Sequence, residues 1–342
     1  MDLALLAGLA ARLNVESYVL EGLGPGQRRL DREAATWLAA LRQRVFAVAV
    51  DNMRRDEEVR GALARLDEAG IAFILLKGSA LRAERQGLAG RFQCDVDVLV
   101  RRADLERAEA LLLEMGFLLD ESFLSRDRLL SEHFHLGLQR RGATIELHWD
   151  VDSLPSPAGF VERLWERSRE VEIDGRPCRV LSPEHQLLFG CLHLSRHAFL
   201  GGLRWLADLR LLLPVPDDVC DRFVEEARAW PRRAVYSPLW LLALHRVPGS
   251  EKLPEGLEAG AAERPILRRL LTALLVAEPW LGLPAWREEK ALCAWLYSER
   301  PLLGLLGEVW SEGLLRKVRS QEEPSSSSAL APAPSGVPER RR

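Results

Sequence analysis

The stretch Ile71-Ala-Phe-Ile-Leu-Leu-Lys-Gly-Ser79 decides how the middle of this 342-residue chain folds. Its first six residues form an apolar run of the length typical of a buried β-strand. The run stops at Lys77, Gly78 and Ser79, where the serine is expected to cap a following helix. Backbone N–H groups at such a helix start attract anions, so this turn is predicted to hold a phosphate, with the Lys77 ammonium adding positive charge.

A second strand is predicted in Cys94-Asp-Val-Asp-Val-Leu-Val100, fifteen residues after Ser79. Strict alternation places Asp95 and Asp97 together on one face of this strand and the apolar residues on the other. Two carboxylates at this spacing repel each other unless a cation lies between them, so they are candidate ligands for a divalent metal ion. Replacing Asp97 by asparagine is accordingly expected to relieve repulsion in the ion-free protein.

A third acid is available in Thr144-Ile-Glu-Leu-His-Trp-Asp150. Alternation puts Glu146 and His148 on the polar face of this predicted strand. The sequence Arg140-Arg-Gly142 just before it indicates a hairpin with residues 133–139. Glu146 is therefore expected to lie close to the aspartate strand, where it can complete a metal site.

Several histidines admit a second interpretation. His133, His135 and His148 lie on predicted adjacent strands, where imidazoles can converge on zinc. No cysteine lies near enough in the sequence to complete a typical zinc set, so packing or substrate contact is favoured for them. Farther along the chain, His193 and His197 share a helix face, as do Arg204 and Asp208 on the next predicted helix, and these four residues are expected to line a cleft.

The order of these segments resembles that of the polymerase-β nucleotidyltransferase superfamily: Gly-Ser at a helix start, an Asp-x-Asp strand, and a later strand with a third carboxylate. More narrowly, Leu75-Leu-Lys-Gly-Ser-Ala-Leu81, Arg91 with the strand ending at Val100, and Ile145-Glu-Leu-His-Trp149 are similar to a bacterial family of uncharacterised nucleotidyltransferases. The likeness covers about residues 70 to 213.

This resemblance implies a Mg²⁺-dependent enzyme that transfers a nucleoside monophosphate from an NTP, with ATP preferred, to an unidentified acceptor and releases pyrophosphate. Its metal ligands would be Asp95, Asp97 and Glu146, holding two Mg²⁺ or Mn²⁺ ions, and its nucleotide contacts Lys77, Gly78, Ser79, Arg91 and His148. A protein or small-molecule hydroxyl is the preferred acceptor. The alternative is a catalytically silent nucleotide-binding protein with a regulatory or scaffold role, although retention of all three acids favours an enzyme.

The predicted architecture is α+β, with a small mixed β-sheet core and packed helices followed by a mostly α-helical domain. The expected parts are an N-terminal helical region at residues 1–70, a catalytic core at 71–155, a mainly helical domain at 156–320 and a disordered tail at 321–342. The tail is rich in serine, alanine and proline, a composition that cannot bury enough apolar surface to fold.

Bulk composition restricts location and partners. The net charge of −3 and the lack of a basic tract make long nucleic acid an unexpected partner. The five cysteines are widely spaced and are expected to be reduced. No uninterrupted apolar run reaches the length of a membrane span, so a cytoplasmic protein without membrane contact is predicted.

Overall fold

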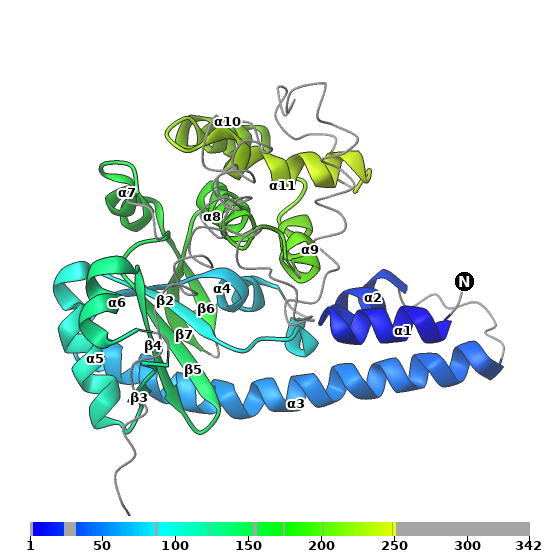
Figure 1. Ribbon diagram of the computed structural model, residues 1–342, viewed down its shortest axis with the longest axis horizontal. Coiled ribbons are helices and arrows are strands. Elements are labelled where there is room, and N and C mark those ends of the chain that lie inside the picture. Colours follow the sequence, from blue (N-terminus) through cyan, green and yellow to red (C-terminus); the bar gives the residue numbers. More distant parts are fainter. Residues whose placement is uncertain are drawn as a thin grey trace, which may run out of the picture.

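The computed structural model describes residues 3–23, 32–85, 88–122, 124–152, 156–173, 175–200, 202–247 and 249–250. These residues form the expected α+β architecture, in which helices cover a mixed seven-stranded sheet of order β3-β4-β5-β2-β1-β7-β6 (Figure 1). Residues 251–342, which include the end of the expected helical domain and the expected tail, lie outside the described part of the chain.

The aspartate strand lies at the centre of the sheet. The strands are β1 (Phe73–Leu75), β2 (Val96–Val100), β3 (Leu118–Leu119), β4 (His135–Arg140), β5 (Ala143–His148), β6 (Arg169–Ile173) and β7 (Arg176–Val180). Strand β2 runs antiparallel to β1 and parallel to β5. The predicted hairpin is confirmed: β4 and β5 pair through a two-residue turn in which Arg141 and Gly142 have φ values of 48° and 80°.

Strands β6 and β7 extend the sheet beyond the expected core. They come from the region predicted to be mainly helical, and β7 pairs in parallel with β1, with Ile74 opposite Arg179. This pairing satisfies backbone groups that would otherwise be exposed along the edge of β1. The sheet is therefore built from residues on both sides of the boundary predicted near residue 155.

The helices are α1 (Leu3–Arg12), α2 (Glu16–Leu23), α3 (Arg32–Glu68), α4 (Lys77–Glu84), α5 (Leu105–Glu114), α6 (Arg126–Glu132), α7 (Phe160–Arg167), α8 (Pro183–Arg196), α9 (Leu203–Leu211), α10 (Asp217–Ala227) and α11 (Arg232–Leu244). Helices α3 and α5 pack on one face of the sheet, and helices α8 to α11 form a layer on the other. Helix α3 continues past the sheet, where α1 and α2 lie against it (Figure 1). None of the described helices has the length and apolar character needed to cross a membrane.

Alternation along β2 divides its side chains between two hydrophobic cores. Val98 and Val100 belong to the core formed with α3 and α5, whereas Leu99 packs into the core of α8 to α11. All three are completely buried, and burying each such side chain contributes about 1.5–3 kcal/mol. Because the helical layer covers the Leu99 face, it also covers the acids that share that face.

Candidate functional site

Strand register brings the predicted acids together. Asp97 on β2 lies directly opposite Glu146 on β5. Opposite residues in a sheet point to the same face, so both carboxylates are directed toward the helical layer. Asp95 immediately precedes β2 and lines the same cavity. The sequence-based expectation that Glu146 lies beside the aspartate strand is confirmed.

A cavity of about 530 Å³ lies over these acids. The sheet side of its wall carries Asp95, Asp97 and Glu146, while the helical layer supplies His193, Arg196, His197, Arg204 and Trp205. His193, His197 and Arg204 therefore line the cleft as expected. Asp208 does not line this cavity. The nitrogen-rich wall faces a wall of carboxylates, which suits a ligand that carries both phosphate groups and bound cations.

Lys77 is the charge partner of the acids in the ion-free protein. Its Nζ forms an ion pair with Asp97 Oδ1 and lies 3.8 Å from Glu146 Oε2. Burial by itself lowers the pKa of Lys77, but Asp97, Glu146 and Asp95 outweigh burial and raise that pKa above its usual value. Lys77 also has a φ of 48°, a strained backbone conformation of the kind found at functional sites.

His148 lies between two of the carboxylates. It is completely buried, and its Nε2 is 3.0 Å from Asp97 Oδ1 and 3.2 Å from Glu146 Oε2. Burial lowers the pKa of His148, yet the hydrogen bonds to Asp97 and Glu146 raise it overall. For Glu146, burial raises the pKa, but the hydrogen bond with His148 and the charge of Lys77 lower it well below its usual value. The carboxylate of Glu146 is therefore held in its charged form.

These contacts correct the expected effect of Asp97→Asn. The aspartates were expected to repel each other in the ion-free protein, so that neutralising one of them would add stability. The repulsion is present, because burial and the charge of Asp97 raise the pKa of Asp95. However, Lys77 and His148 also contact Asp97, and removal of its charge leaves Lys77 with less compensation. The predicted gain in stability therefore no longer follows.

Gly78 and Arg91 meet at the edge of the cavity. A Cβ atom on Gly78 would lie 2.3 Å from Arg91 Nη1, so only glycine lets the guanidinium pack here. Arg91 donates Nε and Nη2 to the two carboxylate oxygens of Asp208 at 2.7 and 2.6 Å. Its Nε also lies 3.1 Å from the Tyr18 hydroxyl. Arg91 thus joins the core to α9 and α2, and most of its donors are already engaged.

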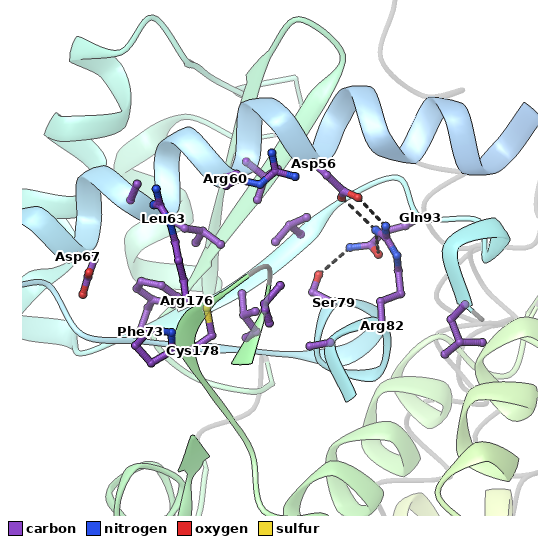
Figure 2. A pocket seen from close by; sticks show the side chains of 18 of the residues that line it. Asp56, Arg60, Leu63, Asp67, Phe73, Ser79, Arg82, Gln93, Arg176 and Cys178 are labelled. Atoms are coloured by element: carbon purple, nitrogen blue, oxygen red, sulfur yellow. Dashed lines mark hydrogen bonds and ion pairs between the residues drawn. The ribbon is translucent and has the colours of Figure 1, made fainter. Parts of the chain in front are cut away.

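Ser79 is directed away from the acids. The expected helix cap at Ser79 is wrong, because α4 begins at Lys77 and its N-cap is Leu76. The Ser79 hydroxyl instead accepts a hydrogen bond of 2.6 Å from Gln93 Nε2. It lines a second cavity, of about 550 Å³, between α3, α4 and the opposite face of the sheet (Figure 2). Of the predicted Lys-Gly-Ser turn, only Lys77 and Gly78 face the acid-lined cavity.

The donor set fits a divalent cation. Three carboxylates converge from two strands, and oxygen ligands of this kind suit Mg²⁺ and Mn²⁺. Among the described residues, His135, Glu146 and His148 each offer one ligand atom within 4.8 Å of the other two. On the sequence alone, His135 is a possible zinc ligand, but packing or substrate contact is favoured for it. Residues equally distant from a two-residue hairpin turn pair with each other, and this rule would have placed His135 opposite His148.

Comparison with known proteins agrees with this geometry. Residues 2–246 match the family described as uncharacterised nucleotidyltransferase. The chain belongs to this family. Family members are transferases that act on nucleotides, so the resemblance identified in the sequence is confirmed. No functionally curated protein matches the chain.

Solved nucleotidyltransferase structures show only a distant likeness. The solution structure of the antibiotic-resistance factor ANT(2'')-Ia is 17% identical, with a TM-score of 0.36, and the match covers 55% of this chain and 94% of that chain. A nucleotidyltransferase-like protein from Paracoccidioides brasiliensis is 16% identical, with a TM-score of 0.35, over 67% of this chain and 92% of that chain.

Proposed function

We propose that the protein transfers a nucleoside monophosphate from an NTP, preferably ATP, to a hydroxyl group of a protein or small molecule and releases pyrophosphate. The observation that carries the proposal is the register of Asp97 with Glu146, beside Asp95, at the floor of a cavity of about 530 Å³. Lys77 and His148 offset part of this negative charge. Burial and the charge of Asp97 still raise the pKa of Asp95, so the site would attract cations that accompany a substrate. A nucleoside triphosphate brings such cations with it.

In this proposal the three acids bind the metal ion. Asp95, Asp97 and Glu146 would hold Mg²⁺ or Mn²⁺, which lowers the pKa of the acceptor hydroxyl and offsets charge on the reacting phosphate. In the ion-free protein the lowered pKa of Glu146 keeps its carboxylate charged, which suits it to holding a cation.

Phosphate binding is assigned to the cationic side chains around the acids. Lys77 lies at the first turn of α4 and lines the cavity together with Gly78. Arg204 stacks over the rings of Phe92 and Trp205, with its guanidinium carbon 5.2 and 5.8 Å from their centroids. Its buried Nε has no hydrogen-bond partner among the described residues, which supports a role in binding an anionic ligand.

The test measures where the α-phosphate and the γ-phosphate of ATP are found after the reaction. Full-length protein is incubated with ATP labelled on the α- or the γ-phosphate, in Mg²⁺ or Mn²⁺, with a cell lysate as the source of acceptor and other NTPs as competitors. We expect α-label on an acceptor and γ-label in pyrophosphate. Transfer of γ-label would indicate a kinase instead. Nucleotide binding without transfer of either label would favour the catalytically silent binding protein.

A further inference from the structure

The β4–β5 hairpin brings two imidazoles to the same carboxylate. His135 and His148 are paired in register, with ring centroids 4.8 Å apart. Glu146 shares their face of the sheet. His148 Nε2 lies 3.2 Å from Glu146 Oε2, and His135 Nε2 lies 3.7 Å from Glu146 Oε1. The two carboxylate oxygens are thus each approached by a different ring.

These separations match the ligand spacing around a single metal ion. Ligand atoms about 2.1 Å from one ion lie roughly 3.0–4.2 Å from each other in tetrahedral or octahedral geometry. The two nitrogen–oxygen distances given above fall within that interval, and all three ligand atoms lie within 4.8 Å of one another. Asp97 Oδ1, 3.0 Å from His148 Nε2, offers a further oxygen at the same spacing. Replacement of the His148 proton by a metal ion therefore needs only small side-chain movements.

The ligand chemistry selects the class of ion. Mg²⁺ prefers oxygen ligands, whereas imidazole nitrogens favour first-row transition metals. We propose that His135, Glu146 and His148 form a binding site for a transition-metal ion of the Co²⁺ or Zn²⁺ class, next to the aspartate pair. This site shares Glu146 with the proposed Mg²⁺ site, and it rests on the proposed transferase for its biological meaning. Metal binding itself can be measured without turnover.

The residues around the site also predict how tightly it binds its metal ion. In tightly held metal sites the second nitrogen of each histidine ligand donates to a carboxylate or carbonyl. The Nδ1 atoms of His135 and His148 are buried and have no such partner among the described residues. The Lys77 ammonium, paired with Asp97, also repels an incoming cation. We therefore expect an exchangeable ion, unlike the permanently bound zinc of a structural site.

The experiment uses Co²⁺ as a spectroscopic probe. Metal-stripped full-length protein is titrated with Co²⁺, and visible absorption reports nitrogen coordination. We expect one Co²⁺ per chain, displaced by Zn²⁺ but not by an equal concentration of Mn²⁺ or Mg²⁺. His135→Ala should weaken Co²⁺ binding at least about tenfold, because even loss of a residue that supports a metal ligand has that effect. The exposed His245 lies outside this site, so His245→Ala is the matched control and should bind Co²⁺ normally.

The design separates this inference from the proposed function. His135 is partly exposed, with 20% of its side chain accessible, so its replacement is compatible with folding, which thermal denaturation checks. Unchanged Co²⁺ binding in folded His135→Ala, or displacement of Co²⁺ by equal Mg²⁺, would overturn the inference. If Co²⁺ binding depends on His135 but the protein transfers no nucleotide, the metal site is supported and only the proposed reaction is contradicted.

Discussion

Two cavities of nearly equal volume, about 530 and 550 Å³, lie on opposite faces of the sheet and share helix α4. In the first, buried charges from different elements converge, as in the contact of Lys77 with Asp97. In the second, Arg82 and Asp56 pair with each other at 2.6 Å beside an apolar region that includes Phe73 (Figure 2). Cavity size therefore does not identify the reactive site. Convergence of buried ionisable groups is what makes the first cavity the candidate site.

One strand creates this difference. Successive residues of β2 point to opposite faces, so Val96 lines the second cavity while Asp97 lines the first. A slip of one residue in the pairing would exchange these side chains. The core on each face prevents the slip, because Val98 and Leu99 are completely buried in different hydrophobic clusters.

The largest effect is expected from removing the charge of Asp97. Asp97→Asn should lower transfer of α-label about a thousandfold or more, because it takes a negative ligand from the metal site. It should also lower the free energy of unfolding, since Lys77 and His148 lose a charged partner. Radiolabel transfer and thermal denaturation measure the two effects separately.

The matched control is Asp56→Asn in the second cavity. Asp56 also pairs with a basic residue, Arg82, but its side chain is 31% exposed and therefore partly screened by water. We expect a loss of stability below about 1 kcal/mol and turnover within a few-fold of the original protein. Similar losses of turnover in the two variants would show that the cavities do not differ in function as proposed.

A loss of stability of about 3–5 kcal/mol is expected for Arg91→Met. The side chains of Arg91 and Asp208 are only 5% and 13% exposed, so removing the arginine leaves a nearly buried carboxylate without its partner. Urea denaturation measures the loss. The double variant Arg91→Met with Asp208→Leu should recover much of it, because no buried charge then remains.

The Arg91 double variant also tests the nucleotide contact predicted from the sequence. If Arg91 chiefly holds α9 over the first cavity, the folded double variant should bind Mg·ATP within about tenfold of the original affinity, a difference of roughly 1.4 kcal/mol. A far larger loss in a protein of restored stability would mean that Arg91 contacts phosphate directly.

Periodicity and spacing were sufficient to predict the centre of the fold. The alternation of residues 94–100 and the two-residue turn at Arg141 and Gly142 depend on local backbone geometry, which the sequence encodes directly. Those two features place Asp97 and Glu146 each on the polar face of its own strand, and the parallel pairing of β2 with β5 then brings them together. The strands that carry the acids could therefore be predicted from local patterns, and their pairing was implied by the family resemblance.

Other features depend on contacts between distant segments. The pairing of β7 with β1 joins residues that are about a hundred positions apart, and the bond between Arg91 and Asp208 crosses a similar interval. No local pattern specifies either contact. The orientation of Ser79 could not be predicted from the sequence either, because it depends on where α4 begins and on the nearby amide of Gln93.

The smallest effect is expected from Ser79→Ala, although the sequence placed Ser79 beside the phosphates. Its hydroxyl bonds Gln93 and lines the second cavity, so its removal should cost about 1 kcal/mol of stability and alter kcat/KM by less than about threefold. The neighbouring Gly78 lines the first cavity. Gly78→Ala places a Cβ 2.3 Å from Arg91 Nη1, and should impair both stability and nucleotide binding more severely. Steady-state kinetics on the two variants compare adjacent residues that face different cavities. A hundredfold loss in Ser79→Ala would assign its hydroxyl to phosphate and would require α4 to turn on substrate binding.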